Sequence, residues 1–309
     1  MTKQARTSPQ NAPPAATTAQ RDVPSGHGCV IPMRSARPVV TPNVVAVTSG
    51  KGGVGKTNFA ANLALAYADR GARVLCIDAD LGLANLDIVM GVAPTYTAAE
   101  LVRGDADIDE VLVRAHDGVF LLPGASGQYD LANLSDAARR NLFSAVDSLD
   151  DRFDVIVVDT GAGVGSNAVG FASASRDIVV VVTPEPTSVA DAYGIIKVLS
   201  TRCAVRRLKV VTSMVASTAE GEQVFRRLSS LVDRFLDTSL VHLGSLPRDP
   251  ALSRAVMRGE PVLRAYPDTH YSRAVQAVAG RLLQQDEPDD RAGAIRLFWR
   301  KLLRQGGRP

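Results

Sequence analysis

The sequence has few cysteines and aromatic residues and no long apolar run. Its three cysteines, Cys29, Cys76 and Cys203, lie far apart and form no C-x-x-C pair, which argues against an iron–sulfur or zinc site and indicates a reducing compartment. No apolar stretch approaches the roughly 18 residues of a membrane span, and the N-terminus has no apolar core of a signal peptide. We therefore expect a cytoplasmic protein that contacts a membrane only peripherally.

A large excess of one charge is also missing. The chain carries 35 basic and 32 acidic side chains, a net charge of +3, so the molecule as a whole is not an obvious nucleic-acid binder. With 309 residues and 46% apolar content, it can form one large α/β domain with tails, or two small domains.

Composition divides the chain into four segments. Residues 1–42 are rich in Pro, Ala, Thr and Ser and are expected to be disordered, because they cannot bury enough apolar surface. Residues 43–284 have the composition of a folded body. The acidic stretch 285–290 is expected to be an extended linker, and residues 291–309 form a basic tail.

In the body, apolar runs that predict strands alternate with stretches of helical periodicity. Strands are expected near 44–49, 73–77, 119–122, 155–158, 178–182, 209–212 and 240–246. Helices are expected at 57–71, as two short pieces between 97 and 113, over a segment carrying Leu131, Leu134, Leu142 and Val146, and at 189–199, 220–235, 251–257 and 270–283. This order predicts an α/β fold with a mostly parallel sheet flanked by helices.

A phosphate-binding loop follows the first strand. Residues 50–57 fit G-x-x-x-x-G-K-[ST] between a predicted strand and a predicted helix, as the motif requires. The glycines allow successive N–H groups to converge on an anion at the helix N-terminus. Lys56 would neutralise the β- and γ-phosphates, and Thr57 would ligate Mg²⁺. The predicted nucleotide contacts are Gly50, Lys51, Gly52, Gly53, Val54, Gly55, Lys56 and Thr57.

Three aspartates are predicted to share the same sheet edge. Asp78 and Asp80 end the second strand, and Asp159 ends the strand 155–158 in the Walker B form. Carboxyl ends of parallel strands are where ligands bind in open α/β sheets. Beside a phosphate loop, such carboxylates organise Mg²⁺ and orient an attacking water.

The loop S-G-K-G-G-V-G-K-T resembles the deviant Walker A motif of the MinD/ParA ATPases, in the SIMIBI class of P-loop NTPases. Residues 74–91, D-T-G-A-G at 159–163 and T-P-E-P-T-S-V-A-D-A-Y at 183–193 are most similar to the flagellar number regulators of the FlhG/FleN/YlxH group. The resemblance implies an ATP- and Mg²⁺-dependent ATPase that dimerises with ATP.

The resemblance also implies residue roles. Lys51 would reach the partner's ATP across the dimer, and Asp80 would orient the attacking water, so Lys51, Lys56 and Asp80 are the predicted catalytic residues. Asp78 and Asp159 would join Thr57 in the Mg²⁺ shell. Asp191 would position Lys51, and Glu185 would lie near the partner's nucleotide.

Two departures from the family pattern are visible. Ser213 stands where the family usually has an asparagine that reads adenine, so base recognition is expected to rely more on the loop 247–250, including Pro247 and Asp249. A serine cannot make the two-point contact of an amide. Residues 1–42 contain no D-Q-A-x-x-L-R segment, with which many flagellar members activate a partner GTPase.

The tail is predicted to be an amphipathic helix. One face carries Ile295, Phe298, Trp299, Leu302 and Leu303, and the opposite face carries arginines. That composition is typical of a helix that lies in an anionic membrane interface. The alternative is that the tail packs back on the protein.

We therefore expect a membrane-associating ATPase switch that regulates flagellar number or placement. Alternatives are a MinD- or ParA-type division or partition ATPase, and a scaffold that holds ATP with little turnover. Expected partners are a second copy, the inner membrane surface, a GTPase of the FlhF type, and flagellar regulators or C-ring proteins. The cluster Arg202, Arg206, Arg207 and Lys209 is expected to be a solvated loop rather than a nucleic-acid site.

Overall fold

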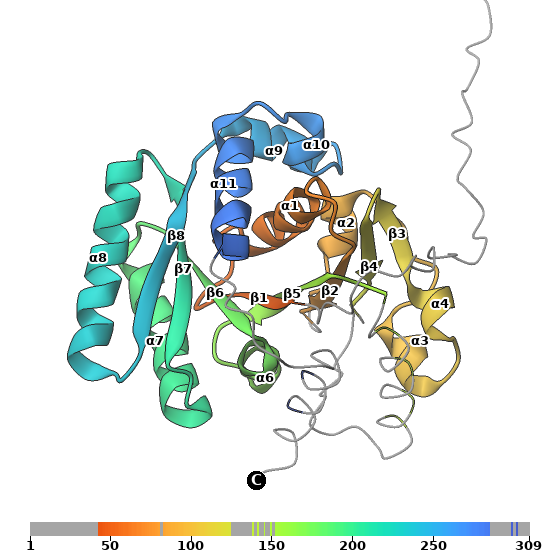
Figure 1. Cartoon of the computed structure of the whole chain (residues 1–309), viewed down its shortest axis with the longest axis horizontal. Coiled ribbons are helices and arrows are strands. Elements are labelled where there is room, and N and C mark those ends of the chain that lie inside the picture. Colours follow the sequence, from red (N-terminus) through yellow and green to blue (C-terminus); the bar gives the residue numbers. More distant parts are fainter. Residues whose placement is uncertain are drawn as a thin grey trace, which may run out of the picture.

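The protein is described by a computed structural model, which places residues 43–80, 83–124 and 152–284 and the single residues 138, 141, 145, 149, 298 and 301. An eight-stranded sheet of order β3-β4-β2-β5-β1-β6-β7-β8 forms its centre (Figure 1). All neighbouring strands are parallel except β3 and β4. The strands are β1 Asn43–Ser49, β2 Val74–Ala79, β3 Val113–His116, β4 Val119–Leu122, β5 Val155–Ala162, β6 Asp177–Val182, β7 Arg207–Val215 and β8 Ser239–Pro247.

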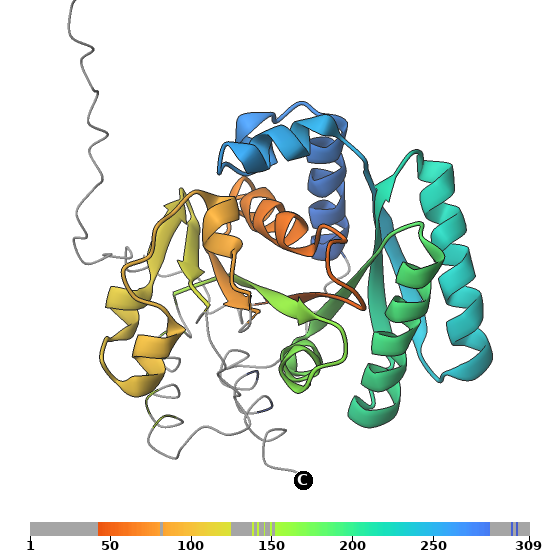
Figure 2. The ribbon, with the colours of Figure 1, turned by 180° about the vertical axis from the view of Figure 1, so that it is seen from behind.

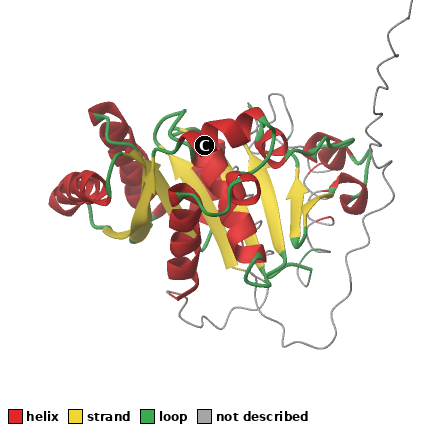
Figure 3. Cartoon of the chain, turned by 90° about the horizontal axis from the view of Figure 1, so that it is seen from above, coloured by secondary structure: helices red, strands yellow, loops and turns green. Residues whose placement is uncertain are grey.

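The central strands are apolar on both faces because both faces are covered. In β1, Val44 and Ala46 belong to one hydrophobic core, whereas Val45 and Val47 belong to the other. Seen from above, the sheet lies between two layers of helices (Figure 3). This arrangement explains the continuous apolar runs that are typical of parallel sheets.

The two helix layers differ in composition. One core contains residues of α3 Ala98–Arg103, α4 Ile108–Val111, α6 Ser166–Ala174, α7 Pro186–Cys203 and α8 Thr218–Phe235. The other contains residues of α1 Lys56–Ala68, α2 Leu86–Met90, α9 Pro250–Met257, α10 Val262–Ala265 and α11 His270–Gln284. The view from behind shows α9, α10 and α11 on the α1 side of the sheet and α6 and α7 on the other (Figure 2).

The strand order determines where along the carboxyl edge of the sheet a ligand site is expected. β1 lies between β5 and β6, and the chain builds β2 and β4 on one side of it and β6, β7 and β8 on the other. Such a reversal of direction is where open α/β sheets bind ligands, beyond the carboxyl ends of their strands. The phosphate loop leaves β1 at this point.

The predicted strands are confirmed, and so are the predicted helices of the described chain. The prediction missed β3, α2, α6 and α10. β3 is a short edge strand, α2 and α10 span five and four residues, and α6 is rich in Gly, Ser and Ala, so none shows a clear periodicity. The four residues that define the predicted helix after residue 124, the arm 1–42 and the linker 285–290 lie outside the described residues. Those four residues are Leu131, Leu134, Leu142 and Val146.

Candidate functional site

The loop between β1 and α1 is tightly packed at its base and open on its concave side. A Cβ on Gly50 would lie 2.1 Å from the carbonyl carbon of Asp191 in α7, whereas one on Gly52 or Gly53 would meet nothing within 4 Å. Gly53 and Gly55 have positive φ, and Gly55 is the N-cap of α1. The open side, at a helix N-terminus, fits an anionic phosphate chain.

Lys56 and Asp159 form a buried ion pair at the centre of this edge. Lys56 Nζ lies 2.8 Å from Asp159 Oδ1, with side-chain exposures of 8% and 1%. Burial raises the pKa of Asp159, and the Lys56 ammonium and the Thr57 hydroxyl, which bonds the same carboxylate, oppose the rise. The structure thus brings Lys56, Thr57 and Asp159 together, as predicted.

The same residues fit a magnesium ion. Asp159 Oδ2 is buried and has no hydrogen-bond partner in the part of the chain that the structure describes. A carboxylate oxygen beside a threonine hydroxyl is the donor chemistry that Mg²⁺ takes. Among the described residues, no group of three or more His, Cys, Asp or Glu side chains could by itself hold a metal ion, so phosphate oxygens and water would complete the shell.

Asp78 is placed opposite Asp159 in the register of β2 and β5. Its carboxylate accepts the N–H groups of Asp80, Asn85 and Leu86 at 3.1, 3.0 and 2.9 Å. Burial and the charge of Asp159 raise the pKa of Asp78 to about 7, although these hydrogen bonds lower it. Asp78 therefore holds the start of α2 here, and its role in the Mg²⁺ shell stays a prediction.

Asp80 follows β2 directly and faces the carboxyl end of β5. Its Oδ1 accepts the N–H of Leu83 at 3.3 Å and lies 3.5 Å from the place where a Cβ on Gly161 would be. The carboxylate is thus held at the same edge as Lys56 and Asp159, where an attacking water would have to be oriented.

Lys51 lies apart from the buried pair and contacts α7. Its Nζ donates to Thr187 Oγ1 at 3.3 Å in a solvent-exposed contact. Thr187 was not predicted; it lies one helical turn before Asp191, the residue expected to position Lys51. Asp191 instead contacts the loop through its backbone at Gly50. Glu185 is exposed at the start of α7.

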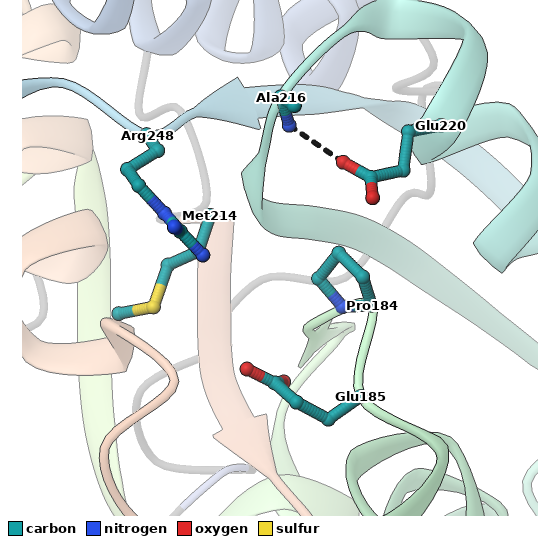
Figure 4. A pocket seen from close by; sticks show the side chains of 6 residues that line it. All are labelled: Pro184, Glu185, Met214, Ala216, Glu220 and Arg248. Carbon is teal, nitrogen blue, oxygen red and sulfur yellow. Dashed lines mark hydrogen bonds between the residues drawn. The ribbon is translucent and has the colours of Figure 1, made fainter.

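A pocket of about 400 Å³ opens beside the loop, at the carboxyl ends of β6, β7 and β8 (Figure 4). Ser213 is buried and does not line it. Asp249, expected near the base, caps α9 at Ala251 N (2.8 Å) and accepts the N–H of Tyr271, and Pro247 ends β8. The pocket is lined by Pro184, Glu185, Met214, Ala216, Glu220 and Arg248. The sequence does not reveal that Met214 lines the pocket, because a bulge in β7 turns this side chain toward the loop. Nor does the sequence reveal Glu220, which lies in the first turn of α8.

Of the predicted membrane face, the structure describes Phe298 alone. Phe298 is 1% exposed and lies in the hydrophobic core, with its ring centroid 6.1 Å from that of Phe171 in α6. Ile295, Trp299, Leu302 and Leu303 lie outside the described residues. At Phe298, then, the chain packs back on the body. No helix in the described chain is long and apolar enough to cross a membrane.

The basic cluster does not form one solvated surface. Lys209 is buried and pairs with Asp177 at 2.7 Å, so the expectation of a solvated loop is wrong for this residue. Arg206 forms an ion pair with the exposed Asp237. These pairs reduce the free positive charge that a nucleic-acid site would need.

Comparison with known proteins agrees with this geometry. The model of the CobQ/CobB/MinD/ParA nucleotide binding domain matches residues 45–262. The chain is 40% identical over 271 residues to the antiactivator FleN of Pseudomonas aeruginosa, which covers 88% of this chain and 96% of FleN. It is 34% identical over 271 residues to the flagellum site-determining protein YlxH of Helicobacter pylori, covering 85% of this chain and 90% of YlxH.

A solved structure supports the same assignment. MinD of Aquifex aeolicus, in a MinC:MinD cell division protein complex, superposes with a TM-score of 0.62 at 30% identity, covering 81% of this chain and 99% of MinD. The resemblance inferred from the motifs is confirmed. The chain belongs to the CobQ/CobB/MinD/ParA family of nucleotide-binding proteins, in its MinD/ParA ATPase branch.

Proposed function

We propose that this chain is an ATP-dependent switch that regulates the number or placement of flagella. The proposal is supported by the similarity to YlxH, which is named as a flagellum site-determining protein, and to the antiactivator FleN. The observation that carries the proposal is the different placement of the two loop lysines. Lys56 is buried against Asp159, whereas Lys51 lies at the surface. One lysine therefore serves the chain's own nucleotide, and the other is available to a second subunit.

The proposed reaction is hydrolysis of the γ-phosphate of ATP by water. Lys56 and the loop N–H groups bind the phosphates, and Asp80 orients the water. Bound Mg²⁺ supplies charge neutralisation at the phosphates. Lys51 of one subunit completes the site of the other, so turnover depends on dimerisation.

The tail is the proposed output of the switch. In the structure Phe298 is held against Phe171, and this contact competes with insertion of the tail into a membrane. ATP-dependent pairing would present two tails, and two weak anchors on one particle bind far better than one through effective concentration. Anionic lipid at the inner membrane is the expected target, and a GTPase of the FlhF type, flagellar regulators and C-ring proteins are the expected protein partners.

Replacing Asp80 by Ala tests the switch. The variant should keep binding ATP and accumulate as a dimer on anionic vesicles, because the water that ends the ATP state is no longer oriented. Sedimentation with vesicles and light scattering, each with ATP and with ADP, give the readout. A monomeric Asp80→Ala protein that stays in the supernatant with ATP would contradict the switch.

Two further measurements separate the alternatives. A dimer-dependent ATPase shows a specific rate that rises with protein concentration, whereas a scaffold shows almost no turnover at any concentration. Cells that lack the gene should show an altered number or position of flagella. Normal flagella together with misplaced division septa or mispartitioned DNA would instead support a division or partition ATPase.

A further inference from the structure

The pocket beside the loop is placed to receive the base of a bound nucleotide, an assumption that rests on the proposed function. A Cβ on Gly55, the last residue before α1, would lie 3.7 Å from Met214 Cε. Met214 therefore lies beside the loop, and a nucleotide with its phosphates in the loop would find space for its base in the pocket behind Met214. The side chains that line this pocket determine which base it recognises.

Ser213 is poorly placed and poorly equipped to select adenine. It is 3% exposed, and its Oγ faces the loop, 3.4 Å from the place of a Cβ on Gly55. An asparagine or glutamine gives adenine a donor and an acceptor at the same time, and this two-point contact rejects guanine. A single hydroxyl makes no such distinction, because it can donate to either purine.

Arg248 is the hydrogen-bond donor that the pocket offers. Its backbone N–H is fixed to the carbonyl of Val215 at 2.9 Å, while its side chain has no ion pair or hydrogen bond within the described residues. Figure 4 shows the Arg248 side chain extending from the end of β8 toward the pocket, which Met214 also lines. A guanidinium carries donors only, and the acceptor pair that it matches best is O6 and N7 of guanine.

Glu185 and Glu220 are the acceptors. Glu220 uses one oxygen for the N–H of Ala216 at 2.6 Å and keeps the other. The carboxylate of Glu185 lies across the pocket from Arg248 (Figure 4). A carboxylate can accept from the 6-amino group of adenine or from the N1–H and 2-amino groups of guanine. Glu185 also accepts a hydrogen bond from the Thr183 hydroxyl, so each carboxylate keeps one oxygen for the base, on a side chain separate from the donor Arg248.

Met214 supplies a surface for the flat face of the base. Its backbone has φ +57 at a bulge where the register between β7 and β8 shifts. Left-handed backbone is unfavourable for a non-glycine residue and is found at functional sites. A thioether packs against an aromatic ring without preference for its hydrogen-bonding edge.

We propose that this chain binds and hydrolyses both ATP and GTP, because Arg248 and the pocket carboxylates replace a single adenine-selecting amide. The activity is that of the site already described, extended to purine nucleoside triphosphates as a class. Arg248 is the residue that allows guanine to bind.

The experiment compares the affinities of the full-length protein for ATPγS and GTPγS with Mg²⁺, by calorimetry. The wild type should bind the two within about tenfold of each other, and Arg248→Ala should lose about tenfold for GTPγS and much less for ATPγS, the size of a lost two-point contact. Arg248→Lys keeps the positive charge but lacks the two parallel N–H donors of the guanidinium, so it should resemble Arg248→Ala.

Arg226→Ala, which removes an exposed arginine of α8 outside the pocket, is the control and should change neither affinity. A wild type that prefers ATPγS by more than about a hundredfold, with a ratio that Arg248→Ala leaves unchanged, would overturn the inference and leave the proposed function intact. Loss of binding of both nucleotides by the wild type would instead overturn the proposed function itself.

Discussion

Phe298 and Phe171 lie with their ring centroids 6.1 Å apart, and Phe298 is almost completely buried. The contact joins the tail to α6 on the face of the sheet that also carries α7 and α8. One tail residue that was expected to face lipid is therefore covered by the protein itself. A residue cannot occupy both positions, so binding to α6 and binding to a membrane exclude each other at Phe298.

Substitutions on the two sides of this contact should have opposite effects. Phe171→Ala removes the body's half of the contact and leaves the tail intact, so the nucleotide-free protein should bind anionic vesicles several-fold better, as expected when a competing state loses stability. Phe298→Ala removes an apolar side chain from the predicted membrane face and should bind vesicles less well. Vesicle sedimentation measures both, and equal effects in the same direction would exclude competition.

Gly50→Ala tests the packing of the loop base. A Cβ would lie 2.1 Å from backbone atoms of Asp191, which cannot move as a flexible side chain can. We expect a loss of about 1–3 kcal/mol in the free energy of unfolding, the usual cost of overpacking. Gly52→Ala is the matched control, since its Cβ meets nothing within 4 Å. Urea unfolding without nucleotide should show a smaller change for Gly52→Ala than for Gly50→Ala.

Gly91→Ala tests the contact between the end of α2 and the turn after α9. Gly91 has φ +70, and a Cβ there would lie 2.2 Å from the carbonyl oxygen of Gly259. Gly71 has a similar φ of +84 with open space around it, so Gly71→Ala reports the backbone strain alone, about 1 kcal/mol. Gly91→Ala should cost clearly more in thermal unfolding; equal costs would show that the turn moves aside.

His242 should make the protein less stable in mild acid. Its ring stacks on Phe225 at 4.7 Å, and burial lowers its pKa below the ordinary value near 6.5. The unfolded chain therefore binds more protons than the folded one. The contribution of the neutral His242 to the free energy of unfolding is fully present above about pH 6.5 and declines as the pH falls through the folded pKa. Urea unfolding should show a smaller loss between pH 7.5 and pH 5.5 for His242→Asn than for the wild type.

His116 provides the comparison for that experiment. Burial, and then the charge of Arg264, lower its pKa as well, so His242→Asn should retain part of the pH dependence. An unchanged slope in the variant would show that His242 becomes protonated without cost to the fold.

The sequence predicted the parts of the site that local chemistry determines. A phosphate loop needs glycines and a lysine in fixed order, and strand-end aspartates follow apolar runs, so Lys56, Thr57, Asp80 and Asp159 could be placed without coordinates. The strand order was less accessible, because β5 pairs with β1 across more than a hundred residues.

Contacts between distant segments could not be predicted. Thr187 bonds Lys51 only because α7 packs on the loop, and Met214 enters the pocket only because β7 bulges. The burial of Lys209 likewise depends on Asp177 in the neighbouring strand β6. From the sequence alone, a charged residue at the start of a strand is expected to be solvated. Its burial can be predicted only when its partner on the neighbouring strand is known.

The pair of Lys56 and Asp159 also bears on how a nucleotide leaves. Asp159 already pairs with Lys56, so a phosphate that enters the loop would have to displace this carboxylate from the lysine. When the product departs, the lysine is not left as an uncompensated buried charge, which would be strongly unfavourable. The ion pair with Asp159 therefore lowers the free-energy cost of the loop without a nucleotide.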